Sequence, residues 1–176
     1  QTVDAWLFST TYRIGWDSTN MGGYFISGAI VAGVGALITV AYVIRRVYKL
    51  EKYITEFHFD KLGKLLALAC LIYLYFNMNE YLIPSYTPSK GEAIHLNTLF
   101  TGSYASLFWL VTVVGLIVPA IAMFFKNGRK PYPMFIIGLI VVIGSWWKRF
   151  IIITPTLLHP FLPIEGVPES WRHYFP

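Results

Sequence analysis

Four long apolar stretches alternate with short polar segments along the chain. They cover about residues 23–44, 62–85, 100–125 and 134–158. Each is long enough for an α-helix to cross a hydrocarbon core about 30 Å thick, which takes roughly 20 apolar residues. The connecting segments are too short to form further domains. The pattern therefore predicts an all-α integral membrane protein whose four helices form a single bundle across residues 1–176.

Composition agrees with this class. The chain is 56% hydrophobic and 13% charged, whereas about a quarter of the residues in soluble domains are charged. It begins at Gln1 without a signal peptide and ends abruptly after Pro176. We therefore expect it to be an internal piece of a longer membrane protein.

Basic residues are unevenly divided among the connecting segments, which predicts an orientation. Nine lie in the first and third connections and three on the opposite side. By the positive-inside rule, the first and third connections are cytoplasmic, and the N-terminal segment, the 84–98 loop and the C-terminal tail face outward. Anionic lipid explains the basic connections without nucleic acid as a partner. The nine are Arg45, Arg46, Lys49, Lys52, Lys61, Lys64, Lys126, Arg129 and Lys130, against Arg13, Lys90 and Arg172.

Small residues recur every fourth position in the first apolar stretch. They form two rows, one of Gly28, Ala32 and Ala36 and another of Ala29 and Gly33. Small residues at this spacing let helix backbones approach closely in lipid. The first helix is therefore predicted to pack within a bundle rather than to act as a lone anchor.

Charged residues inside the apolar stretches are the main candidates for function. Glu80 is the only acid in the four stretches, and Asn79 precedes it. At about 1.5 Å per residue, Glu80 and Arg149 reach similar depths near the outer face. We expect them to form a buried pair, because a charge facing lipid is costly. Lys148 points about 100° away from Arg149 and should reach the headgroups or another chain.

Two interpretations of this pair remain open from the residues alone. Glu80 and Arg149 could form a purely structural ion pair or extend separately to the headgroups. Alternatively, they could line a polar site that handles protons or a polar ligand, as ionisable groups inside membranes often do.

A second group of titratable residues lies where the second apolar stretch begins. Asp60 and Lys64 have the favourable i,i+4 order, and His58 is nearby. They could simply form a solvated helix start. They could also take up or release protons at the cytoplasmic side, with His58 titrating near neutral pH. Pro119 and Gly115 further predict a kink in the third helix.

Several kinds of chemistry are not expected in this chain. All four histidines, His58, His95, His159 and His173, lie at the edges of the stretches or outside them, so a pair of histidines holding haem within the bundle is not expected. Cys70 is the only cysteine and can form neither a disulfide nor a thiolate metal site. Phosphate-binding and nucleophile motifs are missing. If electrons are transferred, the redox centres are expected in other subunits or in a diffusing cofactor.

Several segments together resemble the second half of NrfD-type (polysulfide-reductase-type) membrane subunits. The closest branch is the large membrane subunit of bacterial alternative complex III, a quinol:electron-acceptor oxidoreductase, or its paralogue. The order and spacing of the segments carry the resemblance more than any single one. They are Gly-Trp-Asp-Ser-Thr at 15–19, Tyr-Phe-Ile-Ser-Gly-Ala-Ile at 24–30, His-Phe-Asp-Lys-Leu-Gly-Lys at 58–64, Asn-Glu at 79–80, Trp-Lys-Arg-Phe at 147–150, Leu-His at 158–159 and Phe-Leu-Pro at 161–163.

The resemblance implies a fold and a function. Such subunits contain two tandem four-helix bundles with extra terminal helices, about eight to ten helices in all, and this chain corresponds to the second bundle. They bind menaquinol or ubiquinol near the outer face of the bacterial plasma membrane, chiefly in the first bundle. Electrons pass to an iron–sulfur subunit and to c-type haems of cytochrome subunits, in a respiratory or photosynthetic chain. A paralogous membrane subunit is a further partner, and the membrane part is thought to move protons.

By this resemblance, the chain supplies pocket wall, docking surface and proton-path residues. The buried polar or proton-path candidates are Glu80, Arg149, Lys148, Asn79, His58, Asp60 and Lys64, and the quinol-side or docking candidates are Trp16, Asp17 and His159. Asp17 departs from the family pattern, which has histidine there. Two other functions remain open: a non-catalytic scaffold that anchors redox subunits, and an ion or solute transporter.

Overall fold

The protein is all-helical over the residues that the computed structural model describes, which are 2–11, 15–16, 18–86 and 90–157. No strand occurs in these ranges. The helices are α1 (Thr2–Ser9), α2 (Met21–Val47), α3 (Glu56–Tyr86), α4 (Lys90–Phe100), α5 (Ala105–Thr112), the π-helical turn η1 (Val113–Ile117), α6 (Val118–Phe124) and α7 (Pro131–Leu157).

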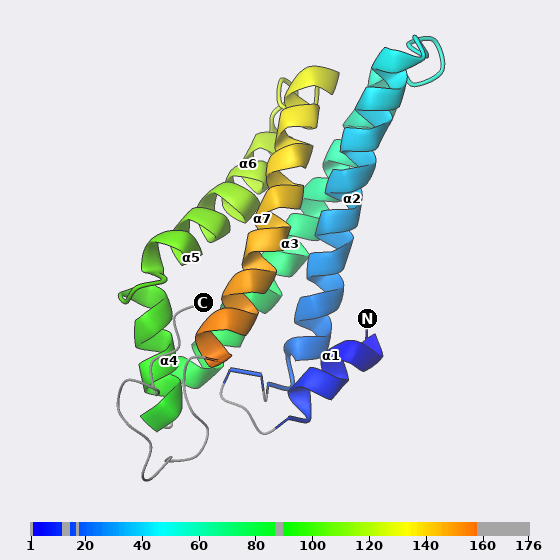
Figure 1. The fold of residues 1–176 in the computed structure, drawn as a ribbon. Helices are drawn as coiled ribbons and strands as arrows, with labels where there is room; N and C mark the ends of the chain where they lie inside the picture. Colours follow the sequence, from blue (N-terminus) through cyan, green and yellow to red (C-terminus); the bar gives the residue numbers. More distant parts are fainter. Residues whose placement is uncertain (1, 12–14, 17, 87–89, 158–176) are drawn as a thin grey trace.

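Three long helices form the body of the bundle. Figure 1 shows α2, α3 and α7 running lengthwise beside one another, with α2 in contact with both of the others. The run α5–η1–α6 covers a further side, where α5 packs on α7 and α6 packs on α3. The all-helical bundle predicted from the apolar stretches is therefore confirmed for the described residues.

The third predicted helix differs from the sequence-based expectation. The stretch 100–125 is not one α-helix, because α4 ends at Phe100 and the chain turns before α5 begins. The expected loop over 84–98 is also wrong, since most of it belongs to the end of α3 and to α4. The predicted irregularity near Pro119 is present as the π-helical turn η1. Proline has no N–H to bond the carbonyl four residues earlier, and the wider π-turn lies directly before it.

By length and composition, three helical segments of the described chain could cross a membrane. They are α2, the continuous run Ala105–Phe124 and α7. The chain is therefore a multi-pass integral membrane protein. The longest helix, α3, is not among the three, and its two ends carry the polar residues Lys61, Lys64, Asn77 and Glu80.

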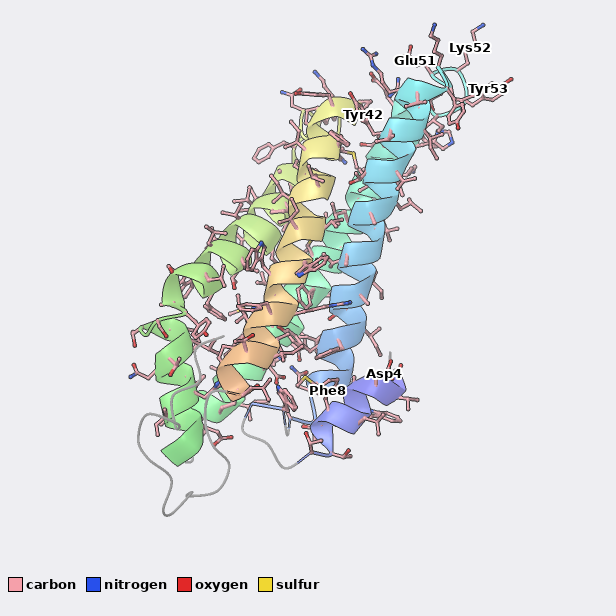
Figure 2. The ribbon with its side chains drawn as sticks, viewed as in Figure 1. Asp4, Phe8, Tyr42, Glu51, Lys52 and Tyr53 are labelled. Carbon is pink, nitrogen blue, oxygen red and sulfur yellow. The ribbon has the colours of Figure 1, made fainter. Side chains whose placement is uncertain are left out.

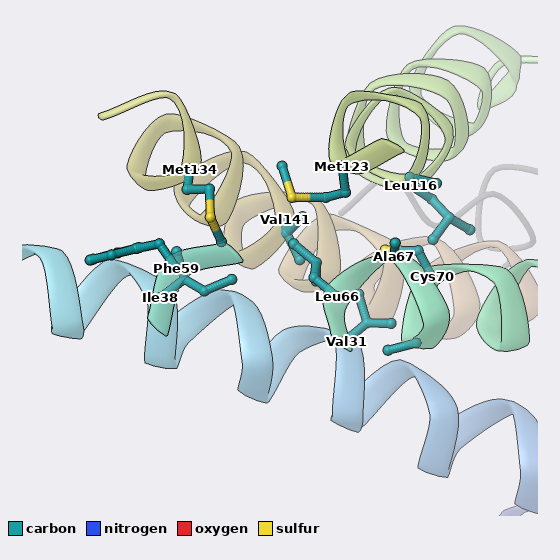
Figure 3. Packing of buried hydrophobic residues seen from close by; sticks show 12 residues of the cluster. Val31, Ile38, Phe59, Leu66, Ala67, Cys70, Leu116, Met123, Met134 and Val141 are labelled. Carbon is teal, nitrogen blue, oxygen red and sulfur yellow. The ribbon is translucent and has the colours of Figure 1, made fainter. Parts of the chain in front are cut away.

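One apolar core joins the long helices. Figure 3 shows its side chains meeting from α2, α3, α6 and α7. Cys70 is fully buried within it and contributes a small side chain to the packing. The core occupies the half of the bundle that leads towards the turn between α6 and α7. Its members are Val31, Ile38, Phe59, Leu66, Ala67, Ala69, Cys70, Leu116, Ala120, Met123, Met134 and Val141.

Glycines set the closest approaches between helices. A Cβ on Gly144 of α7 would lie 2.9 Å from the Cα of Gly115 in η1, and one on Gly35 of α2 would lie 2.9 Å from the Cγ1 of Val141. A Cβ on Gly33 would meet nothing within 4 Å. The small-residue rows thus correctly predicted a packed helix, but Gly33 makes none of the close contacts and Gly35, outside those rows, does.

We expect Gly144→Ala to destabilise the bundle by about 1–3 kcal/mol, because the new methyl group meets backbone atoms that cannot rotate away. Gly33→Ala is the matched control, since the same methyl group there enters open space. Thermal unfolding of the two variants in detergent provides the measurement. Equal unfolding midpoints would show that the α7–η1 contact is looser than described.

The two ends of the bundle differ in charge. Figure 2 shows Glu51, Lys52 and Tyr53 at the turn between α2 and α3, and Asp4 and Phe8 on α1 at the opposite end. The turn between α6 and α7 lies at the same end as the α2–α3 turn (Figure 1). The two basic connections therefore share one end, as the positive-inside argument requires. Which end faces the cytoplasm stays a prediction.

Candidate functional site

A cavity of about 180 Å³ opens at the end of the bundle formed by α1 and α4. Its polar side chains come from three separate parts of the chain. Ser18 belongs to the segment before α2, Glu80 to the end of α3, and Glu92 and His95 to α4. Apolar side chains from α4 and α7 complete the wall. We call it the Glu80 cavity; its further lining residues include Tyr24, Tyr81, Leu96, Leu99, Ile151 and Ile152.

Gly15 positions the segment that closes this cavity. Its φ of 84° lies in the left-handed region that favours glycine. A Cβ there would also lie 2.9 Å from the Cγ2 of Thr156 and 3.0 Å from the Nε2 of His95. The next residue, Trp16, donates its indole N–H to the carbonyl of Ile152 on α7, at 3.1 Å. Gly15 and Trp16 thereby lie close to both α4 and α7.

Glu80 is an acid of the cavity that is held by hydrogen bonds from described residues. Its residue is 9% exposed, and its Oε2 accepts hydrogen bonds from the Ser18 hydroxyl (3.0 Å) and the Asn20 amide (3.3 Å). Asn20 also donates to the carbonyl of Phe76, at 2.8 Å. Hydrogen bonds from such donors compensate the burial of a carboxylate. The predicted burial of Glu80 is confirmed, but the described partners come from the segment before α2.

His95 belongs to this cavity although the sequence interpretation left it at the edge of a span. Its residue is 8% exposed and lines the cavity together with Glu92. Both His95 and Leu99, which lies one turn further along α4, are buried. That i,i+4 spacing of two buried residues is the sequence signal that could have revealed both α4 and the histidine.

The burial of Lys148 and Arg149 on α7 is the reverse of the prediction, which placed Arg149 inside the bundle and Lys148 outside. Lys148 is 5% exposed, whereas Arg149 is exposed at the surface of the bundle. Among the described residues, Arg149 forms no ion pair, so the predicted Glu80–Arg149 pair is wrong. The physical reason is the rotation of α7, whose buried face includes Val141, Lys148 and Ile151 at helical spacing.

Aromatic rings surround the Lys148 ammonium. Its Nζ lies 4.6 Å from the centre of the Phe108 ring and 5.2 Å from that of the Tyr81 ring. The two rings pack edge to face, with centres 5.2 Å apart. Glu80 attracts this cation through its negative charge. Lys148 Nζ has no hydrogen-bond partner among the described residues.

Asn77, rather than the predicted Asn79, shares the buried face of α3 with Glu80. Asn77 is buried, with its Oδ1 unpartnered within the described chain, and Asn79 is only half-buried. Three residues separate Asn77 from Glu80, which places them on one side of the helix. Asn79 lies outside this buried side of α3.

The predicted cluster at the start of α3 is only partly assembled. Asp60 bonds Lys64 at 2.6 Å and Arg129 at 3.2 Å, so it ties α3 to the turn before α7. The hydrogen bond from Lys64 lowers the pKa of Asp60 below its usual value, and the positive charge of Arg129 acts in the same direction. The exposed His58 instead contacts Thr55 at the helix start. A proton-handling role for these residues stays a prediction.

Two predicted site residues, Asp17 and His159, lie outside the described residues. Trp16 is described and packs against Phe8, with ring centres 5.0 Å apart. Within the described ranges, no group of three or more His, Cys, Asp and Glu side chains could hold a metal ion.

A comparison with protein families identifies the family of the chain. The family model described as "Polysulphide reductase, NrfD" matches residues 1–160 of the chain. No curated protein matches it.

Proposed function

Because the chain belongs to the NrfD family of polysulphide reductase membrane subunits, we propose that it forms part of the membrane subunit of alternative complex III. The family supplies integral membrane subunits to quinol-oxidising electron-transfer complexes, and these associate with iron–sulfur subunits. The finer assignment to this branch is supported by the order and spacing of the segments 15–19, 58–64, 79–80 and 147–150.

The observation that carries the proposal is the Glu80 cavity. Oxidation of one quinol to quinone releases two electrons and two protons, so it requires an electron acceptor and groups that take the protons. We assign the electrons to iron–sulfur and c-haem centres of partner subunits. We assign protons to Glu80 and His95, a carboxylate and an imidazole that line one cavity at the end of the bundle. The apolar side chains of Leu96, Leu99 and Ile151 suit an aromatic headgroup.

The membrane arrangement that we propose includes α3 as a fourth span. It packs along α2 over its length, and its central residues from Leu65 to Phe76 are free of charged side chains. With the basic connections on the cytoplasmic side, the Glu80 cavity opens near the outer face. Iron–sulfur and c-type cytochrome subunits would then dock at the end that carries α1 and α4.

The test is purification of the native complex that contains this chain, in lipid nanodiscs, followed by addition of menaquinol or ubiquinol. We expect iron–sulfur and c-haem subunits to copurify, and the haem absorbance to show reduction when quinol is added. A chain that purifies as a homo-oligomer without redox subunits would contradict the proposal and favour a transporter. Redox subunits that copurify without quinol-dependent reduction would favour a scaffold.

A further inference from the structure

Lys148 is buried without a hydrogen-bond partner, although an ammonium group carries three donors. Its residue is 5% exposed, and its Nζ lies over the rings of Tyr81 and Phe108 without a hydrogen-bond partner among the described residues. The hydroxyl of Thr112 is also buried and unpartnered, and the buried hydroxyl of Tyr24 interacts with Tyr73 and Tyr81. Polar groups buried without partners cost free energy, so two together in one region require an explanation.

Two small cavities flank Lys148 and bring these atoms together. One has a volume of about 30 Å³, and its polar lining residues are Tyr24, Tyr73, Ser145, Lys148 and Arg149. The other has a volume of about 20 Å³ and is lined by Tyr73, Ser145, Lys148 and Thr112. A water needs roughly 10–15 Å³ of such space and two to four polar partners. The first cavity satisfies both requirements. The second has the space, but its exposed lining is almost entirely apolar, and apolar cavities stay empty.

These cavities form a series that begins at the Glu80 cavity. Tyr24 and Ile152 line both the Glu80 cavity and the first small cavity. Tyr73, Ser145 and Lys148 then line both small cavities.

The series ends within the bundle. The second small cavity is also lined by Val31 and Leu116, which belong to the apolar core. Figure 3 shows the core side chains that continue from there to Phe59 and Met134. The polar residues Asp60 and Arg129 lie at that far end of the bundle, so the core separates them from Lys148.

The turn η1 contributes to the space beside Thr112. It begins at the next residue, and its i,i+5 bonding makes a wider turn than an α-helix. Gly115 in this turn and Gly144 on α7 both line the second cavity and carry no side chain to fill it.

We propose that the first small cavity holds bound water that connects the Glu80 cavity with Lys148. This water accepts a hydrogen bond from the ammonium and bonds the Tyr24 hydroxyl. This inference concerns the interior next to Lys148 and holds whatever ligand enters the Glu80 cavity.

Radiolytic hydroxyl-radical labelling of the complex in nanodiscs, read by mass spectrometry, tests the proposal. Radicals formed from bound water modify adjacent side chains, so Tyr73 should be modified although it does not line the Glu80 cavity. Tyr75 on the same helix is the matched control, because its exposed side chain faces lipid. Met123 and Met134 of the core should stay unmodified in spite of their high reactivity. An unmodified Tyr73 would show a dry cavity, and modified core methionines would show that water continues through the bundle.

The Lys148→Met variant tests whether the ammonium holds the water. Modification of Tyr73 should fall severalfold, while that of Tyr24 should persist because Tyr24 also lines the Glu80 cavity. Unchanged modification of Tyr73 would overturn the role of Lys148. If Lys148→Met does not assemble, Ser145→Ala removes only a hydroxyl that lines the first small cavity and should lower Tyr73 modification about twofold. No decrease in Ser145→Ala would equally overturn the proposal.

Discussion

Glu80→Gln should reduce quinol-dependent turnover roughly tenfold or more, because removal of a group that accepts protons in the reaction typically costs a factor of about 10²–10⁴. The amide keeps the shape of the side chain and one oxygen that can accept the hydrogen bonds from Ser18 and Asn20. Assembly and haem content should therefore change little. The measurement is haem reduction after quinol addition, normalised to the amount of assembled complex.

Glu56→Gln is the matched control for this prediction. It is the same chemical change on the same helix, but at the exposed opposite end of α3. Turnover in Glu56→Gln should equal that of the unmodified complex. Unchanged turnover in Glu80→Gln would contradict a proton-accepting Glu80. Loss of assembly with normal activity per assembled complex would instead favour the scaffold function.

Hydropathy predicted the helices well, because long apolar stretches have few alternatives in lipid. It failed between residues 84 and 105, where α4 is short and carries Glu92 and His95 among its apolar residues. A helix of this kind resembles a polar loop in composition. Its packing against α3, α5 and α7 is a tertiary effect that a single stretch does not encode.

The positions of Lys148 and Arg149 could have been predicted from a longer pattern. On α3 and α7 the buried residues follow alternating steps of three, four or seven residues, the spacing of one helix face. Lys148 continues that face and Arg149 does not, just as Glu80 continues it and Asn79 does not. The matching residues are Phe59, Gly63, Leu66, Cys70, Asn77 and Glu80 on α3, and Met134, Gly138, Val141, Lys148, Ile151 and Pro155 on α7.

The partners of Glu80 could not have been predicted in the same way. Ser18 and Asn20 lie about 60 residues from Glu80 along the chain, in a segment without periodicity. The close contacts of Gly15 with His95 and Thr156 depend equally on three distant segments. Sequence patterns indicate which face of a helix is buried, whereas partners from irregular segments follow only from the folded chain.

Lys148→Met should raise the thermal stability of the protein, because methionine avoids the cost of burying an ammonium group. The ammonium has no direct hydrogen-bond partner among the described residues, and its two ring contacts contribute about 0.5–2 kcal/mol each. The cost of removing an ammonium from water is several kcal/mol. Methionine occupies similar volume and packs well against the rings of Phe108 and Tyr81.

Arg149→Met provides the control on the neighbouring residue. Because Arg149 is exposed and forms no ion pair within the described chain, its replacement should leave the unfolding midpoint nearly unchanged. Thermal unfolding of both variants in the same detergent gives the comparison. A Lys148→Met variant less stable than the unmodified protein would show that bound water and the charge of Glu80 compensate the buried ammonium fully. A larger effect in Arg149→Met would show that α7 has the opposite rotation, with Arg149 inside.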